Sequence, residues 1–239
     1  MGTLTLVATP IGNIDDISIR AIRVLFSASR VLCEDTRNTG FLLSEVEKRY
    51  GAALSLKRNE NQKLIRFDIV NEMSEMPQVI EDLKHDISYV LVSDAGTPLI
   101  NDPGYLLVQA CIKRSIPVTC IPGPVAAVAA LSLSGLPSQQ FMYLGYFPEK
   151  AAHQVKLLQS LVTISTSIQP TYIAYVSPHK MQTNLVSMLS VFGDIPIVFA
   201  RELTKMYEEV WRGTVKQAME VFAEPKGEFV MLFRLEKSS

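Results

Sequence analysis

The sequence contains little that would build a metal centre or a membrane anchor. Its 239 residues include only three cysteines and three histidines, which lack the spacing of metal ligands. No apolar run approaches the ~18 residues of a membrane-spanning helix, and the N-terminus has no basic segment followed by a long apolar one. We therefore expect a cytoplasmic protein that holds no metal and has no membrane partner.

Several catalytic motifs are also missing. The sequence has no GxSxG, no P-loop and no HExxH, so it gives little support for nucleophile chemistry. Its first candidate loop, TPIGN at 9–13, has a single glycine and is not the GxGxxG of a dinucleotide site. The loops of this chain are better suited to binding than to cleavage.

Net charge is small, but the charges are unevenly placed. The chain has 23 Lys and Arg against 24 Asp and Glu, a net charge of −1, which argues against a protein that coats bare nucleic acid. Residues 1–66 hold 10 basic against 7 acidic residues, 67–111 hold 1 against 8, and 112–239 hold 12 against 9. A solvated acidic helix face explains the middle block most simply, and the flanking blocks leave room for a local basic rim.

Short apolar runs alternate with helical patterns in the first half of the chain. We expect strands at 4–9, 31–34, 53–57, 89–93 and 116–121, and helices at 17–26, 41–50, 79–83 and 105–113. Because parallel strands need crossover connections, this alternation predicts an α/β fold with a mostly parallel, doubly wound sheet.

The pattern changes after Ile121, where IPGP interrupts the chain. We place a domain boundary there, with an N-terminal α/β domain at 1–121 that carries the candidate cofactor and substrate loops and a C-terminal mixed α/β domain at 122–239. The second domain has predicted strands at 141–147, 171–176, 196–203, 208–214 and 228–235. The third and fourth are too close for an intervening helix, so they predict an antiparallel hairpin and a mixed sheet.

Ligands of open α/β sheets bind outside the carboxyl ends of the strands, so the loops there are the candidates. TPIGN at 9–13 is either a tight turn or a set of backbone groups presented to a ligand. In SDAGTP at 93–98, Asp94 either caps its own turn or holds a ligand ammonium or ribose hydroxyl. The small Ala95 and Gly96 beside it permit close backbone approach.

Two further polar clusters have both a structural and a functional interpretation. EDTR at 34–37 supplies either a base or metal ligands, or a salt-bridged network with an N-cap. Arg201, Glu202 and Lys205 follow a buried apolar run, and they either belong to a hairpin turn or face the first domain across a cleft.

Seven long motifs follow one another along the chain: VATPIGNIDDISIRAIRVL, EDTRNTGFLL, VSDAGTPLINDPGY, IPGPVAAVAALSLSGLP, YVSPHK, ARELTKMYEEVWRGT and KGEFV. Together they resemble the ribosomal RNA small subunit methyltransferase I family of the tetrapyrrole methylase superfamily, from about residue 4 to residue 233. The resemblance implies a two-domain methyltransferase that binds S-adenosylmethionine in a cleft between its domains, releases S-adenosylhomocysteine and forms a homodimer.

The resemblance also assigns cofactor-binding residues. It implies a proline loop, a main binding loop after the fourth strand, backbone contacts at the start of an alanine-rich helix and a closing group from the second domain. In that order they are Pro10, Ile11 and Gly12; Asp94, Ala95, Gly96, Thr97 and Pro98; Val125 and Ala126; and Tyr175, Val176, Glu202 and Leu203.

Proteins of this family methylate the 2′-oxygen of a cytidine ribose in small-subunit ribosomal RNA, so the implied partner is this RNA or the assembled small subunit. In-line positioning of the ribose hydroxyl against the methyl group supplies much of the rate acceleration. A base, or a cation that stabilises the developing alkoxide, would add to it. The sequence does not identify the catalytic group. The substrate-facing candidates are Glu34, Asp35, Arg37, Arg201 and Lys205, and the candidate bases are Glu34, Asp35 and Glu202.

The chain departs from the family pattern in three places. Val125 stands where the family commonly has Ser, Val176 stands where it has Glu, and the sequence ends at 239 where the family usually continues into a small helical extension. Backbone contacts to a cofactor survive both substitutions, whereas the missing carboxylate near His179 alters the substrate side. Two other functions stay open: a precorrin-type methylase, which should have more glycine in its first loop, and a cofactor-binding protein without transferase activity.

Overall fold

The computed structural model describes residues 1–236, so the last three residues of the predicted second domain lie outside it. The chain divides into an N-terminal unit, Met1–Val125, and a C-terminal unit that begins at Ala126. The boundary predicted after Ile121 falls at the end of the last strand of the N-terminal unit. Among the described residues, no helix is both long enough and apolar enough to cross a membrane.

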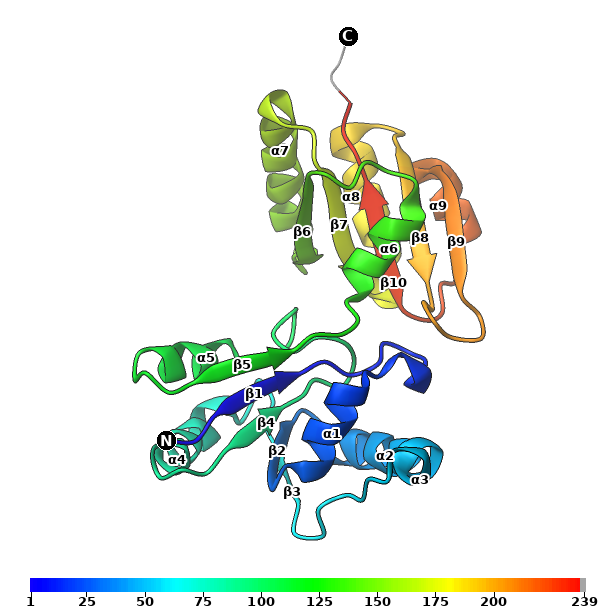
Figure 1. Ribbon diagram of the computed structural model, residues 1–239. Helices are drawn as coiled ribbons and strands as arrows, with labels where there is room; N and C mark the ends of the chain where they lie inside the picture. The colour runs from blue at the N-terminus through cyan, green and yellow to red at the C-terminus, as the bar shows by residue number, and fades with distance from the viewer. Residues whose placement is uncertain (237–239) are drawn as a thin grey trace. The chain divides into compact units, whose positions relative to one another are not determined.

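The N-terminal unit is built on a five-stranded parallel sheet. Its strands are β1 (Leu4–Val7), β2 (Arg30–Cys33), β3 (Lys63–Arg66), β4 (Tyr89–Leu91) and β5 (Val118–Ile121), in the order β3-β2-β4-β1-β5. The longer helices of this unit are α1 (Ile19–Ser27), α2 (Thr36–Val46), α4 (Glu72–Lys84) and α5 (Tyr105–Ile112) (Figure 1). The predicted α/β fold with a parallel, doubly wound sheet is confirmed.

Alternating side chains along the strands build a separate core on each face of this sheet. In β4 and the residue after it, Val90 and Val92 pack with α1 and α2, whereas Tyr89 and Leu91 pack with α4 and α5. This is the period-2 alternation of a strand that is buried on both faces. The two cores hold the strand ends, and therefore the loops that follow them, in fixed positions.

One predicted strand is wrong. Residues 53–57 do not form a strand, because the chain continues from α2 through a π-helical turn, Glu47–Gly51, into α3 (Ala52–Leu54). Alanine and leucine favour helix, and the helix ends only at Ser55, which has a left-handed backbone with φ of 53°. Leu54 and Leu56, which suggested a strand, pack against the core of α1 and α2 from the end of this helix. The third strand of the sheet is instead Lys63–Arg66.

The C-terminal unit has a mixed five-stranded sheet. Its strands are β6 (Phe141–Tyr146), β7 (Thr171–Val176), β8 (Pro196–Arg201), β9 (Glu209–Thr214) and β10 (Phe229–Phe233), in the order β6-β7-β10-β8-β9. Only β6 and β7 are parallel, and β8 and β9 form the predicted antiparallel hairpin. The mixed sheet is confirmed, with the fully buried β10 at its centre.

Helices cover the two faces of this second sheet unequally. The main core lies between the sheet and three helices, α7 (Ala151–Ser167), α8 (Met181–Phe192) and α9 (Val215–Val221). The opposite face is contacted by α6 (Ala126–Ser134) over β7, β8 and β10 (Figure 1). Arg212 donates hydrogen bonds to the carbonyl oxygens of Leu133 and Ser134, which end α6, and so fixes this helix to the hairpin.

Helix α9 begins with a capping box that offers a local test of stability. The Thr214 hydroxyl accepts a hydrogen bond from the Gln217 backbone N–H, and the Gln217 side-chain oxygen accepts one from the Thr214 N–H at 3.0 Å. Replacing Thr214 by alanine should lower the free energy of unfolding by about 1 kcal/mol. Urea denaturation followed by circular dichroism measures this, with Thr214→Ser, which keeps the hydroxyl, as the control. Equal losses in both variants would rule out the cap as the cause.

Candidate functional site

The polar loops of the N-terminal unit meet at one edge of its sheet. All five strands are parallel, so the loops after β1, β2, β4 and β5 leave the sheet at the same edge. They comprise residues 8–13, 34–35, 92–104 and 122–125. The structure thus brings together the first-domain residues that the sequence assigned to cofactor and substrate.

Three of these loops are joined by hydrogen bonds. The backbone N–H groups of Thr9 and Gly96 donate to each other's carbonyl oxygens, at 2.8 Å from Thr9 and 3.2 Å from Gly96. The Thr97 hydroxyl donates to the carbonyl oxygen of Pro124 at 3.0 Å. The loop after β4 therefore holds the proline loop on one side and the loop after β5 on the other.

Gly96 sits where the three loops come closest. Its φ of +84° is in the left-handed region, and a Cβ placed on it would lie 3.2 Å from the Ile11 Cγ2 and 3.4 Å from the Pro124 carbonyl oxygen. Pro10, Ile11 and Pro98 are buried beneath this junction, whereas Gly12 and Ala95 are exposed. The loops are anchored by buried prolines and expose positions with little or no side chain.

Asp94 links the loop after β4 to the loop after β2. Its carboxylate accepts hydrogen bonds from the Asp35 backbone N–H at 3.3 Å and from the Asn38 amide at 2.8 Å, and its own N–H donates to Glu34 at 3.1 Å. The side chain is exposed. These contacts cross between loops, so Asp94 fixes the arrangement of the edge rather than capping its own turn alone.

Asp35 and Arg37 mainly satisfy each other. Asp35 is the N-cap of α2 and accepts from the Arg37 backbone N–H at 2.8 Å, while the guanidinium pairs with both carboxylate oxygens. These contacts with Arg37 hold the pKa of Asp35 far below its usual value. The structural interpretation of EDTR, an N-cap with a salt bridge, describes the geometry of these two residues.

Two half-buried carboxyl groups at this edge have raised pKa values. Burial raises the pKa of Glu34, and burial together with the negative charge of Glu34 raises the pKa of Asp102 to about 6. Asp102 comes shortly before α5 in the sequence. Leu99 and Asn101, which precede it, both have left-handed backbones, with φ of 71° and 74°. Asp102 is not among the candidates predicted from the sequence, because an Asp-Pro-Gly motif shows neither the burial of this carboxyl nor its proximity to Glu34.

The pKa of Asp102 predicts a pH-dependent contribution to stability. Because the pKa of Asp102 is about 6 in the folded state and 3.8 for an ordinary Asp carboxyl, the folded state binds this proton more tightly than the unfolded chain. The contribution of Asp102 to the free energy of unfolding therefore falls as the pH rises between these two pKa values and stays constant at higher pH. Asp102→Asn lacks this titration, so its free energy of unfolding should increase relative to that of the parent protein as the pH rises from 3.8 to about 6. Chemical denaturation at a series of pH values measures this difference. A difference that does not change with pH would contradict the raised pKa.

Two of the residues predicted for the second domain lie on opposite faces of β7. Val176 is buried in the core beneath α8, whereas Tyr175, the preceding residue of β7, points to the opposite face. Val125 ends the N-terminal unit and Ala126 begins α6, and both are half-buried. The cofactor contacts predicted for these four residues, like those predicted for the loops of the N-terminal unit and for Glu202 and Leu203, stay predictions.

The charged cluster after β8 is internally paired. Lys205 donates to Glu202 and to Glu228, each at 3.0 Å, and the Glu228 backbone N–H donates to Glu202 at 2.8 Å. The Glu228 N–H bond and the Lys205 charge lower the pKa of Glu202. Arg201 donates to the Lys226 carbonyl oxygen at 2.8 Å and pairs with Glu209. The buried Leu203 follows Glu202 at the start of the turn.

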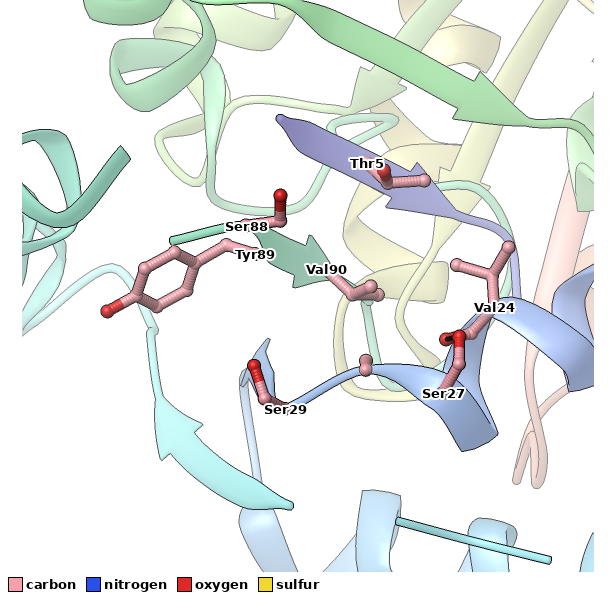
Figure 2. A pocket seen from close by; sticks show the side chains of 8 residues that line it. Thr5, Val24, Ser27, Ser29, Ser88, Tyr89 and Val90 are labelled. Atoms are coloured by element: carbon pink, nitrogen blue, oxygen red, sulfur yellow. Dashed lines mark hydrogen bonds between the residues drawn. The ribbon is translucent and has the colours of Figure 1, made fainter. Parts of the chain in front are cut away.

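A separate hollow lies away from these loops, where β2 and β4 begin. Its volume is about 250 Å³. Figure 2 shows its polar lining, with the serine hydroxyls of Ser27, Ser29 and Ser88. None of the predicted site residues lines it. Across residues 1–236, no group of three or more His, Cys, Asp or Glu side chains is arranged to hold a metal ion.

Comparisons with known proteins agree on one family. Residues 3–219 match the family model of tetrapyrrole (corrin/porphyrin) methylases. A ribosomal RNA small subunit methyltransferase I from a Hydrogenobaculum species is 39% identical, with 98% of this chain and 96% of that protein covered. The protein of the same name from Halalkalibacterium halodurans is 40% identical over 97% of this chain and 75% of its own length.

A solved structure shares the fold. The uroporphyrin-III C-methyl transferase of Thermus thermophilus, complexed with S-adenyl homocysteine, matches with a TM-score of 0.62 over 97% of each chain. Its sequence is 14% identical to this one, so this likeness concerns the architecture alone.

Proposed function

The chain belongs to the ribosomal RNA small subunit methyltransferase I family of the tetrapyrrole methylases, and on this premise we propose that it transfers the methyl group of S-adenosylmethionine to the 2′-oxygen of a cytidine ribose in small-subunit ribosomal RNA. The observation that carries the proposal is the hydrogen-bonded set of loops at the carboxyl edge of the N-terminal sheet. This edge is where α/β proteins bind nucleotide-like ligands.

The residues of this edge fit such a cofactor. Gly12 and Ala95 are exposed and small, so a ligand can approach the backbone at both positions. Asp94 is exposed, and its carboxylate has further acceptor sites for ribose hydroxyls or an ammonium group. The loops are already held in place by the Thr9–Gly96 and Thr97–Pro124 hydrogen bonds, so little ordering is needed on binding.

When bound, S-adenosylmethionine supplies an electrophilic methyl group on a good sulfonium leaving group. The acceptor hydroxyl must lose a proton as its oxygen forms the new bond to carbon and the carbon–sulfur bond breaks. We propose Asp102 as the group that takes this proton and later releases it to water. A carboxyl with a pKa of about 6 is ionised at neutral pH and still basic enough to act as a general base.

The other candidate bases are less suited to this role. Arg37 holds the pKa of Asp35 low, and the Glu228 N–H bond and Lys205 hold the pKa of Glu202 low, so both are weak bases. Glu34 has a raised pKa but accepts the Asp94 N–H. We propose that its charge sustains the basicity of Asp102.

Two alternatives make different predictions. A precorrin-type methylase would methylate a tetrapyrrole, but solved tetrapyrrole enzymes that share the fold are 14–18% identical, while relatives at 39–40% identity are named for ribosomal RNA. A binding protein without transferase activity would bind S-adenosylhomocysteine and transfer nothing.

The deciding experiment supplies purified protein and S-adenosylmethionine with a labelled methyl group to small ribosomal subunits that lack 2′-O-methylation. We expect the label in an alkali-resistant dinucleotide that contains cytidine, because a 2′-O-methyl group blocks alkaline cleavage of the RNA. Label on a base, or transfer to a precorrin but not to RNA, would refute the proposal. We further propose a homodimer, which light scattering would show as twice the chain mass.

A further inference from the structure

An aromatic face on the C-terminal unit joins Tyr175, a predicted cofactor residue, to two tyrosines that the sequence analysis assigned to no site. The rings of Tyr143 and Tyr146 both meet the ring of Tyr175 edge to face, with centroids 5.2 Å and 5.8 Å apart. The three residues belong to β6, an edge strand, and its neighbour β7. Tyr146 is 52% exposed, so this cluster presents an aromatic surface to solvent.

A β-bulge places Tyr146 on this face. Tyr143 pairs with Ile173 and Tyr146 pairs with Tyr175, so three steps along β6 match two steps along β7. In a regular strand, residues three positions apart point to opposite faces. Gly145 lies within the bulge with φ of +66°, a conformation that glycine adopts without strain. Bulges re-aim side chains at functional positions, and this one brings a third tyrosine to the cluster.

The other face of β6 and β7 is ordinary core. Met142, Leu144, Tyr172 and Ala174 pack with the core beneath α7 and α8. The tyrosine cluster therefore lies on the α6 side of the sheet, which α6 contacts over β7, β8 and β10. The cluster is not required to fill the main core.

Basic residues follow the aromatic face at the ends of its two strands. Because β6 and β7 are parallel, their carboxyl ends lie at the same edge of the sheet. The exposed Lys150, His179 and Lys180 come directly after these ends, with one acidic residue, Glu149, among them. Exposed aromatic rings beside cations are the combination by which proteins bind unpaired nucleotides, because the bases stack on the rings and the phosphates meet the cations.

We propose that Tyr146 stacks against an unpaired base of the RNA substrate while Lys150 and Lys180 contact the adjoining phosphates. The choice of RNA rests on the proposed function. The adenine ring of the cofactor is also a planar base of the kind that stacks on a tyrosine ring, so the experiment must distinguish RNA from cofactor.

The test measures binding of the full chain to a fluorescent single-stranded oligoadenylate and to the same strand in a duplex. Tyr146→Ala should weaken binding of the single strand about tenfold and leave duplex binding unchanged, because paired bases are not available for stacking. Tyr146→Phe should retain the affinity. Val186→Ala, which changes a side chain that is 52% exposed on α8, is the matched control and should have no effect.

A second variant tests the bulge without removing the ring. Gly145→Ala puts a side chain on a left-handed residue, so it should favour regular pairing and turn Tyr146 away from Tyr175. Its single-strand affinity should fall like that of Tyr146→Ala, and Gly145→Asn should recover part of it because asparagine tolerates this conformation. Thermal melting of each variant checks that the unit remains folded.

The outcomes separate this inference from the proposed function. Unchanged single-strand affinity in Tyr146→Ala would overturn the stacking role even if the parent protein methylates ribosomal RNA. Weaker S-adenosylhomocysteine binding with unchanged RNA binding would assign the ring to the cofactor and overturn it as well. Tyrosine-dependent RNA binding in a protein that transfers no methyl group would support the surface and refute the proposed function.

Discussion

Replacing Asp102 by asparagine should lower the rate of methyl transfer by about 10²–10⁴-fold, the usual contribution of a general base. Asparagine keeps the shape of the side chain but cannot take a proton from the ribose hydroxyl. The affinity for S-adenosylhomocysteine should change little, because Asp102 has no role in the proposed cofactor contacts. Single-turnover transfer to small ribosomal subunits and calorimetric titration with S-adenosylhomocysteine measure the two quantities separately.

The pH profile distinguishes proton transfer from a purely structural role. For the parent protein, the rate should fall as the pH is lowered through about 6, where the Asp102 carboxylate becomes protonated. Asp102→Asn should lack this limb. Glu34→Gln removes a negative charge that raises the pKa of Asp102, so it should move the limb to lower pH. A parent profile without this limb would exclude Asp102 as the base.

Replacing Gly123 by alanine should cost about 1–3 kcal/mol of stability and weaken cofactor binding more than tenfold. A Cβ on Gly123 would lie 2.7 Å from the Cβ of Ala8. Neither atom can rotate away, so the backbone must move. Ala8 precedes the proline loop and Gly123 precedes Pro124, which accepts the Thr97 hydrogen bond, so the shift would pull two of the joined loops apart.

A compensating substitution controls this prediction. Ala8→Gly removes the other Cβ, and in the double variant the space is again sufficient for both loops. The double variant should regain most of the cofactor affinity, whereas Ala8→Gly alone should be only slightly destabilised. Calorimetric titration and thermal melting of the three variants give the result. If the double variant binds no better than Gly123→Ala, the close contact with Ala8 is not what limits binding.

Most of the fold could be predicted because each element had a local cause. The apolar runs at β4 and β10 and the short link between β8 and β9 are visible in the sequence. The third strand was missed because alternating leucines after Gly51 fit a strand as well as a helix end, and only packing against α1 and α2 decides between them. Pattern alone does not separate short apolar runs of this kind.

The candidate site could be predicted as a set of loops but not as an arrangement. Motif resemblance assigned Asp94 and Gly96 to the cofactor site as a prediction, and the Thr9–Gly96 and Thr97–Pro124 hydrogen bonds that arrange the loops join residues far apart in the sequence. The raised pKa of Asp102 depends on burial and on Glu34, and neither can be read from an Asp-Pro-Gly motif. The bulge at Gly145 was also hidden, because a glycine in a strand does not reveal how its neighbours pair.

The position of β10 constrains the order in which the C-terminal unit can form. In the sheet order β6-β7-β10-β8-β9, the central strand is synthesised after all four strands that flank it. Until Phe229–Phe233 leaves the ribosome, the β6–β7 pair and the β8–β9 hairpin have no strand between them and expose unpaired edges. The N-terminal unit needs no later segment to complete its sheet. During synthesis, its loops at the carboxyl edge can therefore form while the second sheet is still open.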